Sequence, residues 1–171
     1  FLPMVHAGNS YAGNPFDEFV NLVKHAIPSD VYYTRLAGLS TVDSVGHPHT
    51  RTMHVMQEKK VGFTFNAYSG SNLVKHLKNN AKTSLHFLWR DTHHTYIQVR
   101  VNGKTEEVGP SVLRKGDKKM KKGFTQYVLK PNHIQFTLAH KEAHDHVRYE
   151  YLNYSLVDGK WHVKLTKGYV T

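Results

Sequence analysis

The sequence predicts a mainly β fold with short helices, built as a single barrel domain. From Tyr32 onward, apolar residues recur mostly at every second position, which is the period of a strand with one buried face. Turn-forming residues separate these runs, as at 43–46 and 158–159. Only two segments have helical spacing. Because these helices interrupt the hairpins and can cover the ends of a barrel, the pattern favours a barrel over a sandwich.

The first helix is expected to begin at Pro15, just after Asn14. Asparagine is a good N-cap, proline suits the first helical position, and two acids follow in the first turn. The apolar residues of this segment form one stripe, made by Phe16, Phe19, Val20, Val23 and Ile27. We therefore assign residues 14–171 to the barrel domain and residues 1–13 to an N-terminal extension.

Strand and turn signals alternate along the rest of the chain. Two runs flank the turn at 43–46, and a third strand follows at 61–68. Ser71 can cap a second short helix, with Leu73 and Leu77 facing inward. The remaining expected segments are a hairpin at 83–108, a loop at 109–123, and strands at 126–131, 133–138, 140–151 and 160–166. The total is about seven strands.

The composition excludes several chemistries and leaves others open. The chain has no cysteine, so thiol catalysis, cysteine-ligated zinc and disulfides are excluded. Its formal net charge of +10 favours encounters with polyanions, and the densest basic run, at 114–122, is a candidate contact for one. No apolar run is long enough for a membrane span. No P-loop, nucleophile elbow or zinc-protease motif is present, so any chemistry would depend on a cofactor.

The N-terminal residues leave the compartment open. The start FLPMVHAG has a cleavage-like ending at Val5-His6-Ala7, and the triplet Asn153-Tyr154-Ser155 is a glycosylation sequon. Both are compatible with a secreted protein. A cytoplasmic protein is the alternative.

Histidines and charged residues are concentrated in HKEAHDHVRYEY, residues 140–151. In a strand, His144, His146 and Arg148 would share one face, and Tyr149 and Tyr151 the other. Two histidines two positions apart on a strand can share a metal ion, so His144 and His146 are candidate metal ligands. A strand that faces a ligand pocket is the alternative interpretation.

Several motifs, in order, resemble the pyridoxamine 5′-phosphate oxidase family. They are NPFDEF (14–19), STVDSVGHPHTRTMHVM (40–56), GFTFNAYSGSNLVKHLKNN (62–80), QVRVNG (98–103) and IQFTLAHKEAHDHVRYEY (134–151) with DGKWHVKL (158–165). The resemblance implies a split β-barrel that forms a homodimer and holds FMN between its subunits. It also implies these cofactor-binding candidates: Arg51, Ser71, Gln98, His144, His146 and Arg148.

This chain departs from the family pattern where the family places cations. Met56 stands in place of a lysine, and Asn72 and Leu73 in place of an arginine-lysine pair that grips the FMN phosphate. Glu142 stands where a substrate-side arginine is expected, and Thr137 replaces a tryptophan. Each charge-assisted contact contributes roughly 1.5–3 kcal/mol. Three missing cations therefore weaken the expected grip on FMN considerably.

The departures predict a divergent family member rather than a true pyridoxamine 5′-phosphate oxidase. Residues 109–130 are also much shorter than the insertion that carries substrate contacts in the family. We expect a binding protein for a small ligand, metal or chromophore, with its pocket at a dimer interface. The alternative is an FMN-dependent oxidoreductase of unknown substrate. Histidines in place of cations would make ligand binding depend on pH.

Overall fold

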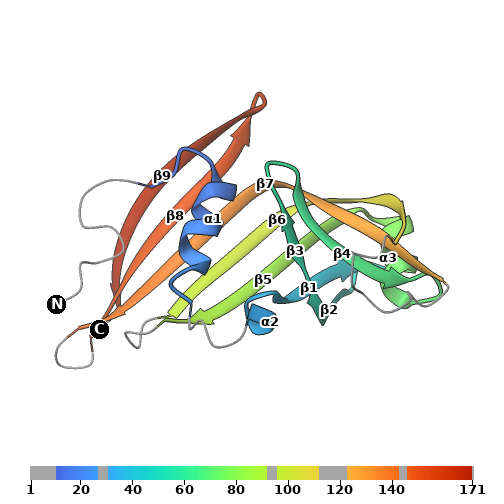
Figure 1. Cartoon of the computed structure of the whole chain (residues 1–171), viewed down its shortest axis with the longest axis horizontal. Helices are drawn as coiled ribbons and strands as arrows, with labels where there is room; N and C mark the ends of the chain where they lie inside the picture. The colour runs from blue at the N-terminus through green and yellow to red at the C-terminus, as the bar shows by residue number, and fades with distance from the viewer. Residues whose placement is uncertain (1–10, 27–30, 92–95, 112–122, 143–145, 171) are drawn as a thin grey trace.

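The computed structural model describes residues 11–26, 31–91, 96–111, 123–142 and 146–170. Within these residues the chain forms one antiparallel sheet of nine strands and three short helices (Figure 1). The strands are β1 (Leu36–Val42), β2 (Pro48–His54), β3 (Met56–Glu58), β4 (Gly62–Tyr68), β5 (Lys82–Arg90), β6 (Tyr96–Pro110), β7 (Phe124–Lys141), β8 (Val147–Val157) and β9 (Lys160–Val170). The mainly β prediction is confirmed.

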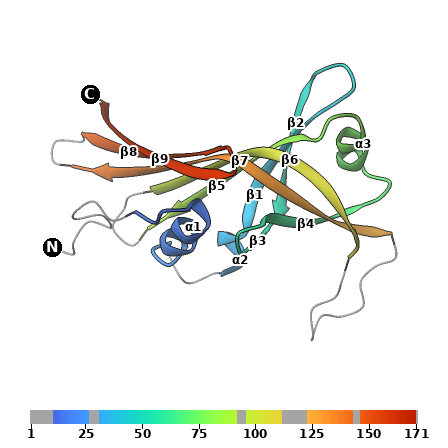
Figure 2. The same ribbon diagram turned by 90° about the horizontal axis from the view of Figure 1, so that it is seen from above.

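Strand β7 is the branch point of the sheet. It pairs along its length with β6, while its first part pairs with β4 and its second part with β8. One path, β2-β1-β5-β6-β7-β4-β3, therefore curls into a barrel, and β8 and β9 extend from it as a wing (Figures 1 and 2).

The sequence prediction of two separate strands at 126–131 and 133–138 is wrong, because β7 is continuous through Pro131. Pro131 lies opposite Gly103 at a register shift, and Asn132 has no opposite residue on β6. A β-bulge is where a strand tolerates a residue without an N–H donor. The bulge therefore explains how the proline fits inside the strand.

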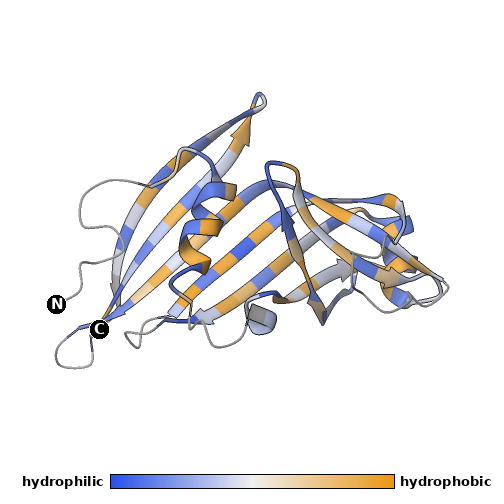
Figure 3. Cartoon of the chain, in the orientation of Figure 1, coloured by the Kyte–Doolittle hydropathy of each residue, from blue (hydrophilic) through white to orange (hydrophobic). Residues whose placement is uncertain are grey.

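Helix α1 (Pro15–Val23) lies across one face of the sheet (Figure 1). Asn14 caps it as predicted, and its side-chain oxygen accepts from the N–H groups of Phe16 and Asp17 at 3.1 and 3.0 Å. The helix ends before the predicted stripe does. Alternate residues along the strands are apolar, and those on the α1 side make the core (Figure 3).

A second correction concerns residues 32–34, which the period-two pattern placed at the start of a strand. They belong to the short helix α2 (Val31–Thr34), and β1 begins only at Leu36. The carbonyl of Thr34 accepts from the indole N–H of Trp89 at 3.1 Å. A helix of one turn has no periodicity of its own, so the sequence did not indicate it.

Helix α3 (Asn72–Asn79) lies at the opposite end of the sheet from α1 and is capped by Ser71 as predicted. The hydroxyl of Ser71 accepts from the N–H of Val74 at 3.3 Å. Leu73 and His76 are buried, and Leu77 packs against the core from a half-buried position. Among the described residues, no helix is long and apolar enough to cross a membrane.

Candidate functional site

A pocket of about 470 Å³ lies where β2, β4 and the start of α3 meet. It contains a guanidinium, two imidazoles, two side-chain amides and an aromatic wall. Its lining residues include Arg51, His49, His76, Asn66, Asn72, Ser71, Tyr68 and Phe124. Two of the predicted site residues, Arg51 and Ser71, therefore lie at one pocket.

One nitrogen of Arg51 is held by the protein and the rest of its guanidinium is not. Its Nη1 donates to the carbonyls of Leu39 and His49 at 3.1 and 3.0 Å, and to Thr41 Oγ1 at 2.7 Å. Partial burial lowers the pKa of Arg51, although an arginine stays charged at any physiological pH. Within the described part of the chain, Nε and Nη2 have no protein acceptor, so they remain for a ligand.

Two histidines stand beside this arginine. The ring centroids of His49 and His76 are 4.6 Å apart. Asp43 Oδ2 lies 2.9 Å from His49 Nε2, and Thr41 Oγ1 lies 2.9 Å from His76 Nδ1. The contact with His49 is the first cause that lowers the pKa of Asp43, so this carboxyl is ionised near neutrality. Burial, followed by repulsion from His49 and Arg51, lowers the pKa of His76.

The start of α3 contributes backbone donors to the same pocket. The first N–H groups of a helix have no partner within the helix, and they attract anions. Ser71 satisfies the N–H of Val74, which leaves those of Asn72 and Leu73 at the pocket. A guanidinium and a helix N-terminus facing one cavity can hold a phosphate or carboxylate group.

Gln98 lies on the other face of the sheet from Arg51. Arg51 is opposite Leu39 in the β1–β2 pair and so points to the core side of the sheet. Gln98 stands between the buried Ile97 and Val99 and so points away from the core. Its Oε1 lies 3.1 Å from His86 Nε2. Within one chain, Arg51 and Gln98 therefore do not face the same pocket.

The strand of histidines is only partly described. His144 and Asp145 lie outside the described residues, and His146 precedes β8, where its carbonyl accepts from the N–H of Glu142 at 2.8 Å. Arg148 and Glu150 share a face as predicted, and Tyr149 and Tyr151 stack on the other with ring centroids 6.1 Å apart. The basic run at 114–122 also lies outside the described residues.

The guanidinium of Arg148 forms ion pairs with two acids of its own chain. It donates to Glu142 Oε1 at 2.7 Å and to Glu150 Oε1 at 2.6 Å. The hydrogen bond to Glu142 is the first cause that raises the pKa of Arg148. The cofactor-binding role of Arg148 stays a prediction. To bind a cofactor, Arg148 would have to release Glu142 or Glu150.

Nothing in the described part of the chain makes a metal centre. No group of three or more histidines or acids is arranged there to hold a metal ion. His144 is outside that part, so the pair of His144 and His146 stays a prediction. The sequence analysis missed His76. Three positions separate His76 from the inward-facing Leu73, a spacing that places both on one helical face, so this residue could have been found.

Acid should destabilise the fold through its buried histidines. Burial is the first cause that lowers the pKa of His76, His133 and His140, and the cation Arg148 adds to it at His140. A folded-state pKa below the unfolded value means that the unfolded chain binds protons first. The free energy of unfolding should therefore fall as the pH drops below about 6.5.

Urea unfolding at about pH 7.5 and about pH 5.5 measures this effect, since carboxylates stay ionised over that range. The variant His140→Gln should lose less stability on acidification than the wild type. An equal or greater loss in the variant would show that His140 has no part in the effect.

Comparisons with known proteins agree with these features. Residues 26–138 match the family described as pyridoxamine 5′-phosphate oxidase. The pyridoxine/pyridoxamine 5′-phosphate oxidase of Pseudoalteromonas translucida is 32% identical over 102 residues, covering 60% of this chain and 47% of that protein. The protein of the same name from Vibrio cholerae is 31% identical over 107 residues, covering 61% and 49%. The chain thus spans about half the length of these curated relatives.

Two solved structures share the fold at low sequence identity. The structure of PhzG from Burkholderia lata, in complex with tetrahydrophenazine-1-carboxylic acid, has a TM-score of 0.74 at 15% identity, covering 92% of this chain and 94% of that one. A pyridoxamine 5′-phosphate oxidase-related, FMN-binding protein from Nostoc punctiforme has a TM-score of 0.61 at 13% identity, covering 94% and 100%. The fold is the split barrel expected from the sequence motifs. The match over residues 26–138 shows that the chain belongs to the pyridoxamine 5′-phosphate oxidase family.

Proposed function

We propose that this chain is a binding protein for a small phosphorylated ligand, with FMN as the first candidate. The observation that carries the proposal is that Arg51 and the first residues of α3 line the same pocket. Charge-assisted hydrogen bonds from a guanidinium, together with the N–H groups of a helix start, suit a phosphate group. The Nostoc punctiforme protein of the same fold is an FMN-binding protein, which adds support for this ligand.

The grip on phosphate is weaker here than the family pattern implies. Leu73, which stands in place of a family cation, is buried in the core, and Met56 is half-buried in β3. Asn72 is exposed at the pocket but carries no charge. Burial lowers the pKa of His76 at the same pocket, so this imidazole adds charge only in acid. We therefore infer that a phosphate is held mainly by Arg51 and the backbone of α3.

We further propose that the chain does not oxidise pyridoxamine 5′-phosphate. Where the family has a substrate-side arginine, Glu142 is an acid, and it binds Arg148 at 2.7 Å. The carboxylate of Glu142 would repel an anionic substrate at that position. The protein would then hold its ligand without performing the reaction of the family.

The test is to load the protein with FMN, add pyridoxamine 5′-phosphate in the absence of oxygen, and follow the visible absorption of the flavin. We expect FMN uptake and an absorption that persists, because no electrons pass to the flavin. Loss of the absorption would show catalysis and contradict the binding role. Absence of FMN uptake would exclude FMN as the ligand.

An FMN-dependent oxidoreductase with a different substrate is the second candidate. Family membership favours it, as does Gln98, which matches a flavin-contacting position of the family and lies beside Thr137 on the outer face of the sheet. Fast bleaching of bound FMN by a reductant that does not bleach free FMN, followed by reoxidation in air, would support this candidate over the binding role.

A homodimer is expected because the matched contacts lie on opposite faces of one sheet. Arg51 and Gln98 could approach the same ligand only if the pocket of one subunit met the outer face of another. Light scattering should therefore give twice the 19.6 kDa mass of the chain. A monomer at working concentration, with FMN bound, would contradict the shared site.

A further inference from the structure

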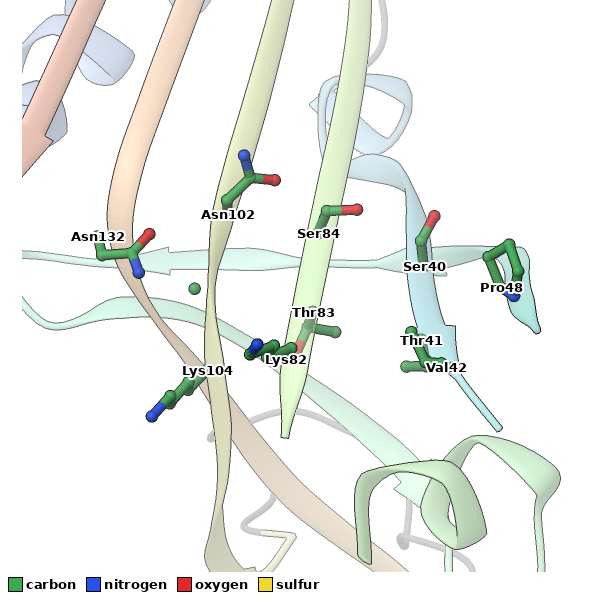
Figure 4. A pocket seen from close by; sticks show the side chains of 11 residues that line it. Ser40, Thr41, Val42, Pro48, Lys82, Thr83, Ser84, Asn102, Lys104 and Asn132 are labelled. Atoms are coloured by element: carbon green, nitrogen blue, oxygen red, sulfur yellow. The ribbon is translucent and has the colours of Figure 1, made fainter. Parts of the chain in front are cut away.

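We propose that a second pocket, separate from the Arg51 pocket, binds a sugar-like ligand that carries a phosphate or sulfate ester. It measures about 390 Å³, which is within the usual range for small-molecule sites. It lies on β1, β5, β6 and the bulge of β7, and no residue lines both pockets. Its lining residues include Ser40, Ser84, Asn102, Asn132, Lys82 and Lys104 (Figure 4).

A row of like charges crosses the sheet at this pocket. Lys82 lies directly opposite Lys104 on β6, and Lys104 lies directly opposite Lys130 on β7. Like charges in directly opposite positions destabilise a sheet. Lys130 is compensated by Glu106, whose Oε2 lies 2.6 Å from its Nζ. In the described part of the chain, neither of the other two lysines has an acid partner.

A bound anion would remove this repulsion. Figure 4 shows Lys82 and Lys104 near one another at one end of the pocket, on adjacent strands. Two ammonium groups can share one phosphate or sulfate group, since each donates charge-assisted hydrogen bonds. The lysine pair therefore defines where the ester group would bind.

The bulge of β7 places an amide at the same pocket. Asn132 is the residue that the register leaves without an opposite residue. The close approach behind it requires glycine at position 103, because a Cβ there would lie 2.1 Å from the carbonyl oxygen of Lys130. Bulges often redirect a side chain near functional sites. The bulge is thus an observation independent of the lysine row that also indicates a site.

The uncharged lining groups suit a hydroxylated ligand. The side chains of Ser84, Asn102 and Asn132 make no hydrogen bond to the described part of the protein, so their donors and acceptors are available. Amides and hydroxyls pair with sugar hydroxyls in both donor and acceptor senses. Among the described residues, no aromatic side chain lines the pocket, so these residues offer no platform on which a nucleobase could stack. A phosphorylated or sulfated sugar fits these groups better than a nucleotide does.

Isothermal titration calorimetry tests the proposal with glucose 6-phosphate, glucose 6-sulfate and inorganic phosphate as probes. All variants are made in the Arg51→Gln background, so that the proposed phosphate pocket contributes as little as possible. The double variant Lys82→Gln/Lys104→Gln should weaken binding of the esters by roughly 10-fold or more. The control Lys160→Gln/Lys164→Gln removes the same charge from the exposed β8–β9 hairpin and should leave that affinity unchanged. Whichever ester binds more tightly identifies the source of the anion.

Three results would overturn the proposal. These are no binding of either ester, a control pair that weakens binding as much as the lysine pair does, and inorganic phosphate that binds as tightly as the esters. The last result would show that the amides and the hydroxyl recognise no sugar. The Arg51→Gln background lacks the charge of the proposed phosphate pocket, so ester binding measured in it does not depend on that pocket and either proposal can fail without the other.

Discussion

The Arg51→Gln variant should bind FMN roughly 10- to 100-fold more weakly than the wild type, because it loses a charge-assisted contact of about 1.5–3 kcal/mol. Among the described residues, Arg51 is the only arginine or lysine that lines its pocket. Glutamine retains a donor that can reach Leu39 or Thr41 but carries no charge. Quenching of flavin fluorescence on titration with protein gives both dissociation constants.

The converse change should restore affinity. Asn72→Arg places a cation at the start of α3, where the family pattern has one, and it should tighten FMN binding by roughly 10-fold. Asn79→Arg is the matched control, because it makes the same substitution at the exposed far end of the same helix. Equal effects of the two substitutions would mean that only net charge matters and that the pocket does not hold the phosphate.

Phe19→Ala should lower the free energy of unfolding by about 3–5 kcal/mol. Phe19 is 7% exposed, and its ring packs edge-on against Phe63, Phe87 and Trp89 with centroids 5.1–5.3 Å away. These contacts fasten α1 to the sheet. Truncation leaves a cavity among three aromatic rings that cannot easily collapse, and it also loses the aromatic pair contacts. Urea unfolding followed by circular dichroism measures the change.

Val20→Ala, at the next position of the same helix, provides the comparison for Phe19. Val20 is only half-buried, so its truncation should cost about 1 kcal/mol or less. A loss of similar size in the two variants would contradict the assignment of Phe19 as the residue that anchors α1.

The parts of the fold with strong local signals were predictable. Asn14 and Ser71 are caps whose chemistry acts within one turn, so both helix starts were predicted. Residues 31–34 and Pro131 were not, because a single-turn helix has no period and a proline in a strand requires knowledge of the bulge opposite it. These features depend on tertiary pairing that the local sequence does not contain.

The sequence pointed to two of the residues that line the Arg51 pocket but not to the arrangement of the predicted contacts. Arg51 and Ser71 lie at one pocket as expected, whereas Gln98 faces away from it. Which face Gln98 takes could have been read from Ile97 and Val99 beside it, since alternate residues share a face. The acids that occupy Arg148 depend on side-chain positions, which no sequence pattern indicates.

The most direct measurement compares FMN with riboflavin, which differs from FMN only in lacking the phosphate. If Arg51 and the start of α3 hold a phosphate group, FMN should bind roughly 10-fold or more tightly than riboflavin, and increasing salt should reduce the difference. Equal dissociation constants for the two flavins would contradict the account, because the pocket would then make no use of the phosphate.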